Sequence, residues 1–384
     1  MTKRKIQFSL VYRDMFQSSG KFQPRKDQLE RIAPVIIKMG CFSRVETNGG
    51  AFEQVNLLYG ENPNKAVRAF TKPFNEVGIK THMLDRGLNA LRMFPVPADV
   101  RRLMYKVKHA QGVDITRIFC GLNDVRNIIP SIKYALEGGM TPQATLCITT
   151  SPIHTAEYYA AIADQVIEAG APEICLKDMA GIGQPEMLGR LTRMIKEKHP
   201  EVIIQYHGHS GPGLSMASIL EVCKNGADVI DTAIEPLSWG KVHPDIISVQ
   251  SMLKHAGFEG IFDGGNDVAH IVQSTEDAGD VYALGVLHLI HEASHVGRHG
   301  EHAQGVQSTV EHVGLDAHFV EGLGEGADGL VGILAIQQVH LLEGTAIGLD
   351  AGKASHLDDD GSDALQLVLA RLELAAALEH VAID

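Results

Sequence analysis

The sequence lacks the signals of several common protein classes. Its five cysteines, at positions 41, 120, 147, 175 and 223, have no CxxC spacing. This excludes a disulfide framework and a zinc ribbon and favours a reducing compartment. The apolar stretch Ile6–Tyr12 is short and Arg13 and Asp14 follow it at once, with no small-residue cleavage site, so we predict no signal peptide. No hydrophobic run approaches the length of a membrane span, and we expect a cytoplasmic protein.

Basic residues are scarce in the last third of the chain. Residues 255–384 contain 3 of the 34 Lys and Arg and 22 of the 47 Asp and Glu, a net charge of −19, whereas residues 1–254 carry +6. The same third contains 12 of the 19 His. The overall charge of −13 argues against a nucleic-acid-binding protein. We place a domain boundary at this change in composition, between residues 1–254 and 255–384.

The first 254 residues alternate between strand and helix patterns. Eight short β-branched or apolar runs predict strands at Ile6–Tyr12, Ser43–Thr47, Lys80–Leu84, Ile115–Cys120, Ala144–Thr149, Glu173–Leu176, Val202–Tyr206 and Asp228–Ala233. Helical periodicity lies between them, for example at Asp27–Met39, Val100–Gln111, Thr155–Ala169 and Glu186–Lys198. Eight such units in about 250 residues are typical of a (β/α)8 TIM barrel. A doubly wound open sheet is the alternative, but no Gly-rich phosphate turn follows the first strand.

Polar residues recur where the predicted strands end, which is where a barrel carries its reactive groups. They are Asp14, Glu46, Asn48, Asp85, Arg86, Asn123, Lys177, Asp178, His207, His209 and Thr232. Within this set His207 and His209 are separated by one residue, so that on a strand their side chains point the same way and can bind one metal ion. With an acidic residue from the first strand they predict an open metal site.

Lys177 is an unusual member of this set because an ammonium group has no lone pair to offer a cation. Two interpretations stay open from the residues alone. Lys177 forms a salt bridge with Asp178 or Asp14, or it reacts with CO2 and becomes a carbamate with anionic oxygens. Arg86 likewise either pairs with Asp85 or Glu46 or binds a carboxylate through two parallel hydrogen bonds.

Several ordered motifs between about residues 10 and 245 resemble the carboxyltransferase family of biotin-dependent enzymes, which includes the carboxyltransferase part of pyruvate carboxylase, the oxaloacetate decarboxylase alpha subunit and the transcarboxylase 5S subunit. The motifs are Arg13-Asp14-x-x-Gln17-Ser18, Glu46-Thr47 with Gly49-Gly50, Leu84-x-Arg86-Gly87-x-Asn89, Phe119-x-x-Leu122-Asn123-Asp124-x-Arg126-Asn127, Cys175-Leu176-Lys177-Asp178-Met179-Ala180-Gly181, His207-x-His209 and Asp231-Thr232-Ala233-Ile234. The Lys-Asp-Met-Ala-Gly segment is the most specific, because related barrel lyases have the HxH pair without this lysine.

The resemblance implies a divalent metal (zinc, manganese or cobalt) held by Asp14, carboxylated Lys177, His207 and His209. It implies that Arg86 binds a 2-oxo acid and that Gln17 hydrogen-bonds to the carbonyl of that acid. Carboxyl transfer between carboxybiotin and the oxo acid would pass through an enolate. Since the sequence has no Ala-Met-Lys-Met biotin acceptor and no ATP-grasp segment, the biotin carboxyl carrier protein and the biotin carboxylase would be separate partners. A homodimer is common in the family.

The sequence departs from the family pattern at three places. Ser210-Gly211-Pro212-Gly213 replaces Asp-Thr-Ser-Gly after the second histidine, and Phe119-Cys120-Gly121 lacks an acidic residue. Lys241 stands where the family has a threonine that carries a proton between biotin and substrate. These changes leave open a biotin-independent lyase or aldolase-like synthase, or a non-catalytic scaffold of a carboxylase complex.

The C-terminal region, residues 255–384, has no counterpart in that family. We expect a mainly helical appendage for packing or oligomerisation, with helices at Asp280–His295 and Asp363–Val381 and a solvated loop at Asp358–Asp360. His291–His295 formally matches the HExxH motif of zinc peptidases, but this segment is rich in His and Glu, and incidental surface histidines are the expected interpretation.

Overall fold

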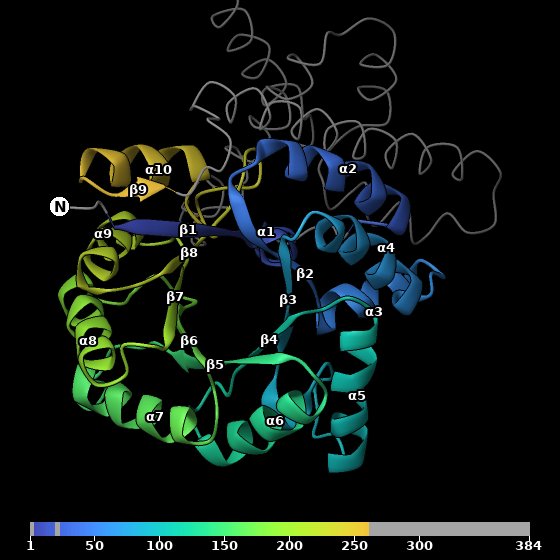
Figure 1. The fold of residues 1–384 in the computed structure, drawn as a ribbon, viewed down its shortest axis with the longest axis horizontal. Coiled ribbons are helices and arrows are strands. Elements are labelled where there is room, and N and C mark those ends of the chain that lie inside the picture. Colours follow the sequence, from blue (N-terminus) through green and yellow to red (C-terminus); the bar gives the residue numbers. More distant parts are fainter. Residues whose placement is uncertain (1–3, 20–23, 261–384) are drawn as a thin grey trace, which may run out of the picture. The chain divides into compact units, whose positions relative to one another are not determined.

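The strands predicted from the sequence form one closed parallel sheet. The computed structural model describes residues 4–19 and 24–260. Within them the barrel strands are β1 (Lys5–Leu10), β2 (Phe42–Gly49), β3 (Lys80–Asp85), β4 (Ile115–Ile118), β5 (Thr141–Cys147), β6 (Glu173–Asp178), β7 (Ile203–Gly208) and β8 (Val229–Thr232). They are hydrogen-bonded in sequence order from β2 to β8 and then β1, and the pairing of β1 with β2 closes the ring (Figure 1). The TIM barrel is confirmed, and the open sheet is excluded by this closure.

Helices follow the strands and surround the barrel (Figure 1). They are α1 (Tyr12–Ser19), α2 (Lys26–Met39), α3 (Gly50–Leu58), α4 (Pro63–Glu76), the 3-10 turn η1 (Gly87–Asn89), α5 (Ala98–Ala110), α6 (Val125–Glu137), α7 (Ala156–Glu168), α8 (Pro185–Lys198), α9 (Ser215–Asn225) and α10 (Ile246–His255). Side chains that precede a helix fix where it begins: the Thr155 side chain accepts a hydrogen bond from the backbone of Tyr158, and that of Asp245 accepts one from Ile247.

The two faces of each strand have different surroundings. On β7, Ile204 and Tyr206 belong to the apolar core that the helices cover. Gln205 and His207 alternate with them and bond across the barrel interior, to residues of β2, β5 and β8. The barrel interior is therefore filled largely by hydrogen-bonded polar side chains, where branched apolar residues are more usual.

The described residues end shortly after α10. A short strand, β9 (Glu259–Gly260), pairs in parallel with β1. The predicted C-terminal helices, the HExxH-like segment His291–His295 and the loop Asp358–Asp360 lie outside the described residues, and the domain boundary after residue 254 stays a prediction. Within the described part of the chain, no helix is long and apolar enough to cross a membrane.

Candidate metal centre

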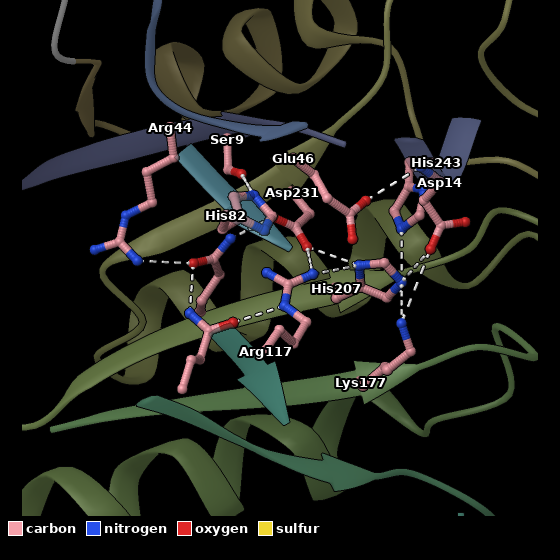
Figure 2. A network of polar contacts seen from close by, with 12 residues as sticks. Ser9, Asp14, Arg44, Glu46, His82, Arg117, Lys177, His207, Asp231 and His243 are labelled. Carbon is pink, nitrogen blue, oxygen red and sulfur yellow. Dashed lines mark hydrogen bonds and ion pairs between the residues drawn. The ribbon is translucent and has the colours of Figure 1, made fainter. Parts of the chain in front are cut away.

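Four residues predicted from the sequence meet at the carboxyl ends of the strands, and Figure 2 shows three of them, Asp14, Lys177 and His207. Lys177 lies at the end of β6 and His207 at the end of β7, and the Lys177 Nζ is 3.1 Å from the His207 Nε2. Asp14 is not in a turn but in α1, the helix that follows β1, and its Oδ2 is 3.4 Å from the His207 Nε2 and 3.9 Å from the Lys177 Nζ. The His209 Nε2 is 3.7 Å from the Asp14 Oδ1. All four residues are buried.

The structure adds a residue that the sequence reasoning missed, His243. It lies between β8 and α10, fully buried, and its Nε2 is 3.2 Å from the His207 Nε2 (Figure 2). One nitrogen of each of His207, His209 and His243 falls within a group whose atoms lie within 4.8 Å of one another. No local spacing relates His243 to the HxH pair, so only its place after the last strand of the barrel could have singled it out.

The tautomer of His207 is set by a charged pair behind it. Its Nδ1 donates to the Asp231 Oδ2 at 2.7 Å, so its Nε2 keeps a lone pair that faces Lys177 and Asp14. The Arg117 Nη1 donates to the same carboxylate oxygen at 2.6 Å. Burial opposes the charge on Asp231, but Arg117 outweighs it and keeps the pKa of this carboxyl below its usual range. Asp231 therefore remains an anion that orients His207.

His209 is oriented by the backbone. Its Nδ1 donates to the carbonyl oxygen of Lys241 at 2.7 Å, which leaves the lone pair of its Nε2 directed toward Asp14. The two histidines of the HxH pair thus both direct their Nε2 toward the centre. A carboxylate orients His207 from behind, and a backbone carbonyl orients His209. Partners of this kind are typical of metal-binding histidines.

Asp14 is held ionised by cations around it. Burial works against its charge, but Arg13 and then Lys177 outweigh burial and lower the pKa of Asp14 well below its usual value. The Arg13 Nη2 lies 2.7 Å from the Asp14 Oδ2 and 3.0 Å from a carboxylate oxygen of Glu46. Glu46, fully buried within β2, also accepts a hydrogen bond from the backbone nitrogen of Asp14. The carboxylate of Asp14 is therefore available as a ligand at neutral pH.

The alternatives left open for Lys177 and Arg86 are partly decided by their neighbours. The Asp178 carboxylate accepts the backbone N–H groups of Ile182 and Gly183, so Asp14 is the acidic neighbour of Lys177. The Arg86 Nη1 donates to the carbonyl oxygens of Leu91 and Arg92, at 3.3 and 3.1 Å.

The acidic residues considered as partners of Arg86 have other contacts. Asp85 accepts hydrogen bonds from Tyr105 and Thr116, and Glu46 pairs with Arg13. Arg86 is half-buried, and burial, followed by the nearby charge of Arg13, lowers its pKa. Two guanidinium groups thus lie close together at this end of the barrel, which favours an anionic ligand.

Three further residues predicted from the sequence do not contribute side-chain atoms to the group of Asp14, Lys177 and the histidines. Gln17 is exposed on α1 and accepts a hydrogen bond from Arg13. The Lys241 side chain is exposed, and only the backbone of Lys241 bonds to the centre. Asn123 has a structural role: its side chain makes two hydrogen bonds with the backbone of Cys147, at 2.8 and 2.9 Å, and so ties the loop after β4 to β5.

The donor set suits a divalent metal of the first transition series. Imidazole nitrogens and a carboxylate oxygen converge, the imidazoles are oriented from behind, and burial followed by nearby positive charge keeps the pKa of His207 well below its usual value, so that it stays neutral. The residues present therefore fit the metal that the resemblance implies.

Comparison with known proteins links this barrel to a group of carboxyltransferases. Residues 123–240 match the protein family described as HMGL-like. A pyruvate carboxylase subunit of Methanocaldococcus jannaschii is 33% identical over 249 residues, which are 65% of this chain and 43% of that protein. The methylmalonyl-CoA carboxyltransferase 5S subunit of Propionibacterium freudenreichii subsp. shermanii is 32% identical over 251 residues, which are 65% of this chain and 49% of that protein. This chain thus spans less than half the length of either relative.

A solved structure gives the same relationship. The carboxyl transferase domain of Rhizobium etli pyruvate carboxylase matches with a TM-score of 0.64 and 26% sequence identity, covering 72% of this chain and 46% of that one. As the motifs predicted, the barrel of this chain is related in sequence and in fold to the carboxyltransferase domains and subunits of biotin-dependent enzymes.

Proposed function

We propose that this chain is a carboxyltransferase subunit that moves a carboxyl group between carboxybiotin, carried by a separate protein, and a small 2-oxo acid of the pyruvate or oxaloacetate type. A biotin carboxyl carrier protein and a biotin carboxylase would be its partners. The observation that carries the proposal is that Asp14 and His207 converge on Lys177, the residue that related barrel lyases lack, while His209 lies on the other oxygen of Asp14.

Asp14, carboxylated Lys177, His207 and His209 would hold the divalent metal. The charges of the centre favour this form of Lys177. Apart from Asp178, whose carboxylate is bonded to the backbone N–H groups of Ile182 and Gly183, the other buried charged groups there are two arginines and three carboxylates, namely Arg13, Arg117, Asp14, Glu46 and Asp231. If all of these are ionised, an ammonium at Lys177 would leave a bound divalent cation with an uncompensated charge of +2. When the Lys177 amine adds to CO2 and releases one proton, the resulting carbamate makes the buried site neutral, which low dielectric surroundings favour.

When bound, the metal would stabilise negative charge that develops on the oxygen of the substrate carbonyl. In the carboxylation direction, the carbon next to that carbonyl loses a proton, and the resulting enolate forms a new carbon–carbon bond with CO2 released from carboxybiotin. The biotin nitrogen that loses CO2 receives a proton in exchange.

Arg86 would bind the carboxylate of the oxo acid, and Gln17 would hydrogen-bond to its carbonyl oxygen. The adjacent charge of Arg13 supports an anion at this position. Gly50 allows Arg86 to lie where it does, because a Cβ atom at position 50 would be 2.6 Å from the Arg86 Nη1. The exposed side chain of Lys241 would carry the proton between biotin and substrate, or bind the anionic substrate in its ammonium form.

The test is decarboxylation of a panel of 2-oxo diacids by the purified full chain, with and without free biotin, together with the metal content of the same sample. Biotin-stimulated decarboxylation of at least one oxo acid, lost on Arg86→Ala, supports the proposal. Arg92→Ala is a matched control, since Arg92 follows in the same loop as an exposed residue. Cleavage or condensation that biotin does not affect would support the lyase or synthase instead, and a metal-loaded chain with no activity would support a scaffold.

A further inference from the structure

We propose that His243 is a further ligand of the metal, so that three imidazoles hold the ion. This inference rests on the proposed metal centre, and it extends that centre by a residue that the resemblance does not supply.

The spacing of the donor atoms is that of a coordination shell. Ligand atoms about 2.0–2.2 Å from one metal ion lie about 3.3–3.6 Å apart with four ligands and down to about 2.8 Å apart with five. The His243 Nε2 is 3.2 Å from the His207 Nε2, and that nitrogen is 3.4 Å from the Asp14 Oδ2. A third distance, from the other Asp14 carboxylate oxygen, Oδ1, to the His209 Nε2, is 3.7 Å. His243 therefore lies within the group of donor atoms. Asp231, in contrast, lies behind His207, on the Nδ1 side of its ring.

The hydrogen bonds of His243 leave it without another role among the described residues. Its Nδ1 is buried and has no hydrogen-bond partner there, and the partner of its Nε2 is the His207 Nε2, the nitrogen whose lone pair the metal would take. A buried imidazole with an unpaired nitrogen costs about 1–3 kcal/mol, and a bond from its other nitrogen to a cation offsets that cost. His82 also has a buried Nδ1 without a partner, but its Nε2 is bonded to the Ser9 hydroxyl at 3.0 Å, whereas the Nε2 of His243 faces another imidazole nitrogen.

The backbone around His243 holds the ring in place. The carbonyl oxygen of His243 accepts a hydrogen bond from the backbone of Trp239 at 2.8 Å, and Pro244 follows it directly. Two residues later Asp245 caps the start of α10. A ligand on a segment fixed at both ends needs little rearrangement to bind, which favours tight coordination.

A third imidazole would also affect which metal is chosen. His243 adds no charge, so the balance between the ion and the anions Asp14 and carboxylated Lys177 is unchanged. Imidazole ligands suit zinc and cobalt, whereas carboxylate and water ligands suit manganese. Of the three metals that the resemblance allows, the site would therefore prefer zinc or cobalt over manganese.

The test is X-ray absorption spectroscopy of the full chain, loaded with zinc at less than one equivalent in the presence of a competing chelator. This loading keeps the 12 histidines of residues 255–384 from contributing to the signal. We expect three imidazoles per zinc in the unaltered chain and two in His243→Gln. The same titration should give a zinc Kd that is at least about tenfold higher in His243→Gln. His82→Gln is the matched control, another buried histidine exchanged in the same way, and should keep three imidazoles.

Two imidazoles per zinc in the unaltered chain would overturn the inference, and this result does not depend on whether any variant folds. Biotin-stimulated transfer measured on the same sample separates the two proposals. Two imidazoles with transfer activity would leave the proposed function standing without His243. Three imidazoles without transfer to any oxo acid would support His243 as a ligand and reject the proposed function. A chain that binds no zinc would refute the three-imidazole site.

Discussion

Asp231→Asn tests whether the pair behind the metal centre has two separable effects, on stability and on metal binding. Asp231 and Arg117 are both completely buried, and the Arg117 Nη1 lies 2.6 Å from the Asp231 Oδ2. The asparagine removes the negative charge but keeps the size of the side chain, so Arg117 is left as a buried cation without its counter-ion. Breaking a buried pair in this way costs about 3–5 kcal/mol. For a barrel of this size, that corresponds to a fall in Tm of about 6–20 °C.

The second effect is on the orientation of His207. An asparagine oxygen accepts the His207 Nδ1 proton less strongly than a carboxylate does, and the other Asp231 oxygen already accepts from Gln205, so the amide nitrogen would face a donor. Loss of such a partner behind a metal-binding histidine weakens metal binding by about 10- to 100-fold. We expect this loss in the zinc Kd of Asp231→Asn.

The double variant Arg117→Met with Asp231→Leu separates the two effects. Replacing both members of a buried pair by apolar residues of similar volume is often neutral for stability. We therefore expect the double variant to recover part of the urea midpoint of the metal-free protein that Asp231→Asn loses, since Gln143 and Gln205 also lose a partner. It should not recover the zinc affinity, because His207 still lacks an acceptor for its Nδ1 proton. An Asp231→Asn midpoint equal to that of the unaltered chain would refute the charge argument, and unaltered zinc binding by the double variant would refute the orientation argument.

Three further outcomes follow from individual residues. Lys177→Ala should bind metal more weakly than the unaltered chain, as measured by metal content after dialysis. Bicarbonate should increase the metal content of the unaltered chain but not that of Lys177→Ala. Bicarbonate dependence that survives the substitution would contradict a carbamate at Lys177. Arg86→Lys should raise the KM for the oxo acid by roughly 10- to 100-fold through loss of a two-point contact, whereas Arg92→Lys should leave it unchanged in the same kinetic assay. Burial raises the pKa of Asp85 to about 6, against about 3.9 in an unfolded chain, so the folded protein keeps a proton that the unfolded chain releases. The free energy of unfolding should therefore fall by roughly 2 kcal/mol between pH 4 and pH 6. Asp85→Asn should remove this fall, so that it is more stable than the unaltered chain at pH 7.5 but not at pH 4. Urea denaturation at the two pH values measures this difference in the free energy of unfolding. The same difference at both pH values would contradict the assignment of the pH dependence to Asp85.

The sequence predicted the fold because its signals are local. Each strand is a short β-branched or apolar run, and each helix has its own periodicity, so the eight strands and the helices between them could be placed before their partners were known. The closure of the sheet into a barrel could be predicted from the number and regular alternation of these strand and helix segments. The HxH pair was predictable for the same reason, since a period of two puts His207 and His209 on one side of a strand whatever surrounds it.

The parts that the sequence missed depend on long-range contacts. Arg117 and Asp231 are 114 residues apart, and nothing near either one indicates that they meet inside the barrel. Asn123 was predicted at a strand end as Lys177 was, yet its side chain ties the loop after β4 to β5, because a position along the chain does not tell which group a side chain will reach. His243 joins the centre from a loop, where no spacing rule applies.

The segment between β8 and α10 connects two of these observations. It orients His209 through the backbone carbonyl of Lys241, and it brings the side chain of His243 beside His207. The contact from Lys241 does not depend on its side chain, so residue 241 can change without moving His209. Residue 243 has no such freedom, because its side chain itself is among the donor atoms. If both proposals hold, a change at Lys241 would affect carboxyl transfer without weakening metal binding, whereas a change at His243 would weaken metal binding.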